Sequence, residues 1–180
     1  PVQTTKWLLE AIDKMLDYDK NIKIMIETKS FTAEELGIAN ENIKNTEGMK
    51  FYNFKSEPFR IYGLYDAQNP ERTRHCRMPV EVAEKVSAGV KWLNYNLAGG
   101  RVRFTTTSNY LALKLTRDEV EVSPKFSYLA RGGVDVYIRR GKVSEPIFSG
   151  IFMPTDTSLN IESLIKLPAG EKQITLVLSN

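Results

Sequence analysis

Catalytic side chains are scarce in this sequence of 180 residues, which contains one histidine, His75, and one cysteine, Cys76. A single cysteine excludes an internal disulfide. A seryl nucleophile needs a base beside it, and that base is nearly always histidine, so His75 would have to fill the role. One histidine and one cysteine do not furnish a zinc site, and no carboxylate cluster has the spacing of a calcium loop. We therefore predict no metal, no other cofactor and no catalytic residue in this chain.

His75 and Cys76 are neighbours in the basic segment Arg72–Arg77. Adjacent side chains on an extended backbone point to opposite faces, so these two would not meet as a base and a nucleophile. We favour structural roles for both, with a catalytic pair as the alternative. The same segment and a second basic cluster, Arg139–Lys142, could contact an anionic ligand, but a solvated loop and a solvated hairpin tip are the favoured interpretation.

Long apolar runs are also missing, since none approaches the roughly 20 residues of a membrane-spanning helix. Residues 1–20 are amphipathic and lack the basic start and apolar stretch of a signal peptide, so the compartment, cytoplasmic or secreted, stays open. The 25 basic and 22 acidic residues are interspersed, whereas nucleic-acid binding needs a basic patch on one face. The sequence therefore predicts neither a membrane nor a nucleic-acid partner.

What the sequence does contain is the material for one globular core, with 42% hydrophobic and 10% aromatic residues. Its N-terminal part, residues 1–48, is predicted to be a small appendage. Thr32–Glu35 matches a capping box that opens a short helix, Gly37 is a plausible stop, and the polar segment Glu41–Gly48 is expected to be a loop. A strand is predicted over Ile22–Ile26.

A helix is predicted over residues 4–18, because apolar side chains recur at one-turn spacing on one face. We hypothesise that this stripe packs on the main domain. Its members are Trp7, Leu8, Ala11, Ile12, Met15 and Leu16.

The main domain, residues 49–180, is predicted to be mainly β. A helix is expected over residues 80–88, with Gly89 as its end and Val90–Tyr95 as a further strand. The absence of a βαβ rhythm favours an antiparallel β-sandwich or jelly roll over a parallel sheet. The clearest alternating segments lie at residues 59–65, 102–105, 111–116, 134–138, 147–153 and 174–178.

Two ring side chains are candidates for ligand binding, because flat aromatic rings stack on the apolar faces of sugars. Trp92 and Tyr95 could form such a platform on an exposed surface, while packing in the core is the alternative role for each. The glycine pair of Ala98–Gly100 is no phosphate cradle, because a strand and not a helix is expected to follow it.

One ordered set of motifs resembles the N-terminal domain that precedes the catalytic domain in bacterial SGNH (GDSL-type) esterases. Its second part, Gly133-Val134-Asp135-Val136-Tyr137, is similar to the Gly-x-Asp-Leu-Tyr signature of that domain, with valine in place of leucine. The stretch Phe51–Tyr65 also fits, and the resemblance covers residues 49 to 180. The first part comprises Arg77-Met78-Pro79, Val86, Gly89-Val90, Leu93, Asn96, Ala98-Gly99-Gly100-Arg101-Val102-Arg103-Phe104 and Thr107-Ser108.

The resemblance implies a jelly-roll-like β-sandwich packed against a C-terminal SGNH catalytic domain. That domain would supply the seryl nucleophile, the oxyanion hole and the Asp-x-x-His block, none of which has a match in this chain. Structural roles are implied for the motif residues, with Asp135 expected to accept hydrogen bonds from a turn, from Arg101 or from Arg103. Tyr137 would share the Asp135 face and reach a domain interface. The full set of motif residues is Gly99, Gly100, Arg101, Gly133, Asp135 and Tyr137.

These observations lead to two hypotheses about function. The first is a non-catalytic accessory domain that supports an esterase and shapes its site for acylated carbohydrate or a similar small ester. The second is an independent carbohydrate-binding β-sandwich module. A solvent-exposed row of aromatic side chains on one sheet face would favour the second, and a bare apolar patch would favour the first.

Overall fold

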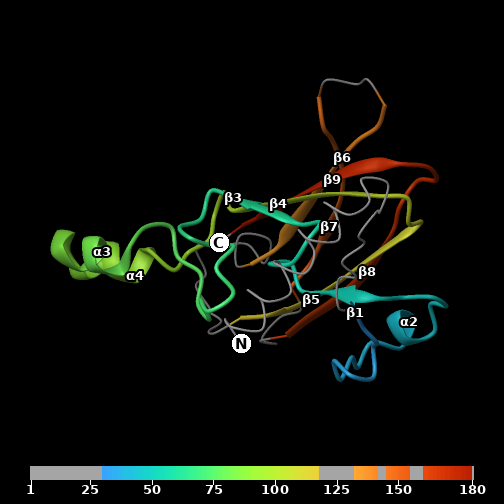
Figure 1. Cartoon of the computed structure of the whole chain (residues 1–180), viewed down its shortest axis with the longest axis horizontal. Helices are drawn as coiled ribbons and strands as arrows, with labels where there is room; N and C mark the ends of the chain where they lie inside the picture. Colours follow the sequence, from blue (N-terminus) through green and yellow to red (C-terminus); the bar gives the residue numbers. More distant parts are fainter. Residues whose placement is uncertain (1–29, 118–131, 142–144, 155–159, 180) are drawn as a thin grey trace, which may run out of the picture.

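A computed structural model describes residues 30–117, 132–141, 145–154 and 160–179. Its main body is an antiparallel sheet of five strands (Figure 1). The order across this sheet is β3-β4-β9-β6-β7, so β9, near the C-terminal end of the chain, lies in the centre. The strands are β3 (Arg60–Tyr62), β4 (Arg101–Thr106), β6 (Val134–Arg139), β7 (Ile147–Phe152) and β9 (Lys172–Leu178).

A second layer is the antiparallel pair of β5 (Tyr110–Thr116) and β8 (Asn160–Lys166). Leucines of β5 and Ile165 of β8 pack on the inner face of the larger sheet. At the centre of this core Val136 and Ile174 are fully buried, and burial of each such side chain stabilises the fold by about 1.5–3 kcal/mol. The predicted fold class, mainly antiparallel β with stacked sheets, is confirmed, and the jelly-roll strand order stays a prediction.

A third layer covers the other face of the β5–β8 pair. It contains β1 (Ser30–Phe31), β2 (Phe51–Tyr52) and the one-turn helix α2 (Glu41–Lys44). Ile38, Ile43 and Phe51 form a small core there, against which Ala112 of β5 and Leu164 of β8 pack. The prediction of a loop over Glu41–Gly48 is therefore wrong at its start, because Asn40 caps a helical turn by accepting a hydrogen bond from Asn42 N at 3.0 Å.

The predicted capping box forms its two reciprocal hydrogen bonds. Glu35 N donates to Thr32 Oγ1 at 3.2 Å, and Thr32 N donates to Glu35 Oε2 at 2.8 Å. The segment that follows is a turn and not a helix, because Gly37 already adopts a left-handed conformation with φ of +59°. The prediction of the capping box is thus confirmed, whereas the prediction of a helix after it is wrong.

Two short helices form a hairpin that projects from one end of the sandwich (Figure 1). The first, α3 (Val80–Val86), follows Pro79 as expected, but the prediction of a strand over Val90–Tyr95 is wrong, because these residues begin within α4 (Ala88–Leu93). Ser87 rather than Gly89 separates the helices. Its backbone is extended, and its Oγ accepts a hydrogen bond from Val90 N at 3.1 Å, which caps α4.

The predicted helix over residues 4–18 and the predicted strand over Ile22–Ile26 lie outside the described residues. Within the described ranges, no helix has the length and apolar character needed to cross a membrane.

Candidate functional site

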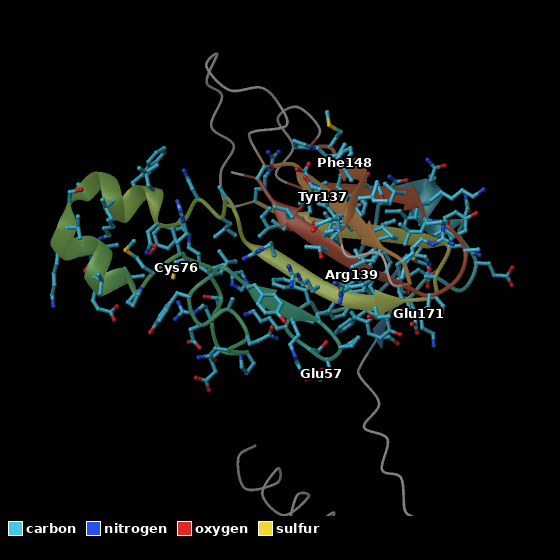
Figure 2. The ribbon with its side chains drawn as sticks, turned by 90° about the horizontal axis from the view of Figure 1, so that it is seen from above. Glu57, Cys76, Tyr137, Arg139, Phe148 and Glu171 are labelled. Atoms are coloured by element: carbon cyan, nitrogen blue, oxygen red, sulfur yellow. The ribbon has the colours of Figure 1, made fainter. Side chains whose placement is uncertain are left out.

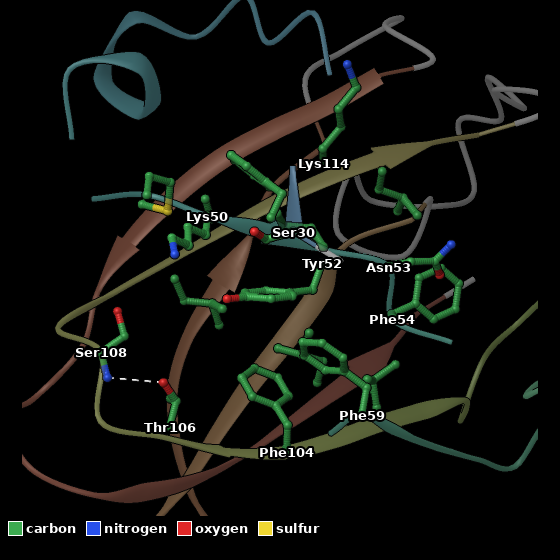
Figure 3. Close-up of a pocket in the computed structure, with 18 of the residues that line it drawn as sticks. Ser30, Lys50, Tyr52, Asn53, Phe54, Phe59, Phe104, Thr106, Ser108 and Lys114 are labelled. Carbon is green, nitrogen blue, oxygen red and sulfur yellow. Dashed lines mark hydrogen bonds between the residues drawn. The ribbon is translucent and has the colours of Figure 1, made fainter. Parts of the chain in front are cut away.

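A cleft of about 1250 Å³ opens where β2 approaches the space between the two main sheets. Its wall combines the inner faces of β4 and β5 with the segment that leads from β2 to β3. Three rings point into it from different elements, namely Tyr52, Phe59 and Phe104 (Figure 3). Phe59 lies at the centre, with its ring centroid 6.4 Å from Tyr52 and 4.9 Å from Phe104 in an edge-to-face arrangement. Aromatic walls of this kind favour apolar or flat ligands.

Polar groups lie along one rim of the cleft. Ser108 N donates to Thr106 Oγ1 at 3.1 Å, and Ser108 Oγ donates to Tyr110 O at 2.7 Å (Figure 3). Lys172, which is almost fully buried beside them, donates from Nζ to Ser108 O at 2.7 Å. Desolvation, with a smaller contribution from Arg140, lowers the pKa of this lysine. These hydroxyl groups are occupied in local turns, so this rim has the character of a structural corner.

His75 also lines the cleft, where its ring centroid lies 5.3 Å from that of Phe54. Its Nδ1 is buried and finds no hydrogen-bond partner in the part of the chain that the structure describes. Desolvation lowers the pKa of His75, and the positive charges of Lys55 and Arg72 lower it further. A catalytic histidine needs a carboxylate or carbonyl to orient it, and that partner is missing among the described residues.

Cys76 is fully buried at the base of the helical hairpin (Figure 2). Its sulfur accepts a hydrogen bond from Arg72 Nη1 at 3.5 Å, and Arg72 also pairs with Asp66 at 3.3 Å. These contacts give the cysteine a packing role in the loop that leads to α3. Across the described ranges, no group of three or more His, Cys, Asp or Glu side chains could hold a metal ion.

Trp92 and Tyr95, the two predicted sugar-platform residues, have different surroundings. Trp92 lies on α4 with 56% of its surface exposed. Tyr95 follows the helix and is half-buried, and the guanidinium of Arg74 lies 3.7 Å from its ring centroid. One face of the Tyr95 ring is therefore covered by a cation, and a sugar platform built from the two rings stays a prediction.

The family model described as GxDLY, the N-terminus of SGNH-hydrolase-type esterases, matches residues 49–179. The chain belongs to this family. Among solved structures, a candidate GDSL-like lipase from Bacteroides ovatus is similar, with 25% sequence identity and a TM-score of 0.52. The matched region covers 58% of this chain and 30% of the lipase chain. The chain therefore corresponds to less than a third of the length of that protein. None of the curated proteins compared matches the chain.

The GxDLY motif leads into β6, which lies between β9 and β7 in the larger sheet. Val134 and Val136 point into the core, whereas Asp135 and Tyr137 lie on the outer face. The backbone turns just before this strand at Gly132, which has φ of +124°. A bulge also occurs, but it lies between Val136 and Tyr137 in the pairing with β7.

The outer face around the motif is basic and partly aromatic. Val177 of β9 pairs with Arg101 of β4 on one side and with Asp135 of β6 on the other, so Val177 separates these two charged residues. None of the hydrogen bonds or ion pairs between described side chains joins Asp135 to Arg101 or Arg103, and Arg103 stacks instead over Tyr62 at 5.2 Å.

Farther along the same face, Tyr137 contacts Phe148 edge-to-face at 5.7 Å (Figure 2). Tyr137 is half-buried and Phe148 is exposed.

The two motif glycines after the hairpin meet the C-terminal strand of the family domain. Gly99, with φ of +84°, donates from N to Leu178 O at 3.0 Å. A Cβ on Gly100 would lie 3.0 Å from Leu97 O and 3.1 Å from a methyl group of Leu178. A side chain at position 100 would therefore be crowded by the backbone of the preceding turn and by Leu178 at the end of β9.

Sequence reasoning missed the cleft itself. Four of its rings come from a short stretch rich in aromatic residues, which was the available signal, but only the fold shows that they and Phe104 face one space. The rings of that stretch that line the cleft are Phe51, Tyr52, Phe54 and Phe59.

Proposed function

We propose that this chain is a non-catalytic accessory domain, which supports the catalytic domain of an SGNH/GDSL-type esterase and shapes its site for acylated carbohydrate or a similar small ester. The observation that carries the proposal is the family match over residues 49–179. The parent reaction would be ester hydrolysis through a seryl intermediate, with the nucleophile and its histidine outside this chain. The lack of a hydrogen-bond partner for His75 Nδ1 among the described residues agrees with this division of roles.

The domain organisation belongs to the same proposal. Residues 1–48 would be an appendage and residues 49–180 the accessory domain, and the start of the family match at residue 49 supports that boundary. Residues 30–48 nevertheless contribute Ile38 and Ile43 to a core shared with β8. We therefore expect at least this part of the appendage to be firmly attached to the sandwich.

An independent carbohydrate-binding module is the second candidate, and the aromatic cleft around Phe59 favours it. An exposed aromatic row on the outer sheet face would favour it further. The strand register instead places three non-aromatic side chains beside Tyr137 in one row across the sheet, namely Arg60 on β3, Arg103 on β4 and Thr175 on β9. Because this line is mainly cationic and polar, it does not make a continuous stacking surface for a sugar chain.

Hydrolysis of a short-chain nitrophenyl ester tests the proposal. The purified 180-residue chain and the same chain extended through its natural downstream sequence are assayed side by side. We expect activity in the extended protein alone. Activity in the 180-residue chain would contradict the proposal, and its loss in His75→Gln would then implicate His75. If both proteins are inactive and the chain binds an acylated oligosaccharide, the binding-module hypothesis is favoured.

A further inference from the structure

The α3–α4 hairpin carries the densest group of exposed apolar side chains in the described ranges. Val86 is 62% exposed, Trp92 56% and Leu93 47%, and Val82 of α3 is also exposed. Monomeric proteins rarely display so many large apolar side chains on one small projection, so this surface is expected to contact a partner. Tryptophan is among the side chains that most often anchor an interface.

The hairpin is held rigidly at its base. Asn94, which is almost fully buried, accepts hydrogen bonds through Oδ1 from the backbone N of Arg77 at 3.1 Å and of Met78 at 2.9 Å. Its Nδ2 donates to Met78 O at 3.1 Å. An exposed ion pair between Lys91 and Glu84, at 2.7 Å, links the two helices. A fixed projection presents its apolar side chains with little loss of conformational entropy on binding.

A notch of about 430 Å³ lies beside this base and has the size to receive a partner's side chain. Val90 and Leu93 of α4 line it together with Gly63, Arg77, Met78 and Asn94. The exposed Leu93 thus borders both the notch and the open surface of the hairpin.

The C-terminal strand ends at the same place. Leu178 exchanges backbone hydrogen bonds with Gly99 and Gly100, which follow the hairpin, and Ser179 N donates to Gly133 O at 3.1 Å. The C marker accordingly lies at the end of the sandwich from which the hairpin projects (Figure 1). In a family whose matched region is the N-terminal part of an esterase, the downstream domain would emerge beside this hairpin.

We propose that the downstream catalytic domain docks on the α3–α4 hairpin, with Trp92 and Leu93 as anchors and with an apolar side chain of that domain in the notch. This proposal rests on the proposed function and assigns a surface to it. A second copy of the chain, bound to the same hairpin, is the competing outcome.

Hydrogen exchange compares the hairpin in the 180-residue chain and in the naturally extended protein. We expect the amides of α3 and α4 to exchange at least about 10-fold more slowly in the extended protein, because docking suppresses their local opening. Equal exchange in both proteins would overturn the proposal. Slower exchange in the 180-residue chain as its concentration rises, with formation of a dimer, would also overturn it.

Paired variants of the extended protein provide the second measurement. Trp92→Ser with Leu93→Ser should abolish the protection and split a single thermal transition into two. The matched control, Ile147→Ser with Met153→Ser, changes similarly exposed side chains on and just after β7 and should leave both readouts unchanged. Splitting by the control variant and not by the hairpin variant would contradict the proposed surface. Esterase activity confined to the extended protein would then still support the proposed function, so the two failures are distinguishable.

Discussion

At the scale of single residues, His75 shows how a side chain can resemble a catalytic group and lack its chemistry. Its ring is half-buried against Phe54, and its Nδ1 has no partner among the described residues. The pKa of His75 is lowered by desolvation first, and then by the charges of Lys55 and Arg72. The neutral ring is therefore favoured in the folded state. Among the described residues a proton added to it meets no carboxylate, which is the reverse of the environment in a catalytic triad.

This environment predicts a stability that depends on pH. Because the folded pKa of His75 lies below the unfolded value of about 6.5, the unfolded chain binds the proton more readily. Stability should be lost as the pH falls below about 6.5 and should level off above it. His75→Gln should flatten the dependence of stability on pH between about pH 5.5 and 7.5, because His75 is the one histidine of the sequence. Urea midpoints measured across that range check it, and an unchanged slope in the variant would contradict the assignment.

At the scale of elements, alternation in the sequence predicts strands reliably where one face is buried and the other is wet. Strands β4 and β6 satisfy this condition, and both were predicted. Strand β9 was predicted as well, although Thr175 on its outer face is buried. Strand β8 was missed, because Ile165 packs on the main core while Leu164 packs on the layer formed by residues 30–48. A strand buried on both faces has no polar and apolar alternation.

The cleft and the hairpin were beyond sequence reasoning for a related reason. Rings that line one space come from β2, from the segment between β2 and β3, and from β4, and only the fold brings them together. In α4, Val90 and Trp92 alternate with Lys91 as they would in a strand, and Gly89 was interpreted as a helix end. The cap supplied by Ser87 outweighs both of these local signals.

The position of Gly89 within α4 predicts a stabilising substitution. A Cβ there would meet nothing closer than Ser87 Oγ at 3.9 Å, so Gly89→Ala should stabilise the helix by about 0.5–1 kcal/mol. Gly100→Ala is the matched control, and it should destabilise the domain because its Cβ would lie 3.0 Å from a backbone oxygen. Urea unfolding of the two variants measures both signs. A loss of stability in Gly89→Ala would show that α4 is not helical at that position.

At the scale of the whole molecule, the layers are joined by polar contacts as well as by apolar packing. Glu162 of β8 accepts hydrogen bonds from the backbone N of Ala39 at 2.7 Å and of Asn40 at 2.9 Å, and it lies 3.5 Å from Lys114 Nζ. One carboxylate thus links the layer of residues 30–48 to both strands of the second sheet. Burial alone would raise the pKa of Glu162, but these hydrogen bonds and the lysine lower it overall.

Replacement of this carboxylate tests whether the residues before 49 are part of one cooperative unit. Glu162→Gln should lower the free energy of unfolding by about 1–3 kcal/mol at neutral pH, because backbone donors lose a charged acceptor. Since the folded pKa lies below the ordinary 4.5, the contribution is present above that pH and is lost as the pH falls through the folded pKa. The two proteins should therefore converge in stability on strong acidification. Glu171→Gln, at an exposed carboxylate, is the control and should change nothing. If Glu162→Gln instead releases the layer in a separate early transition, residues 30–48 form an independent appendage after all.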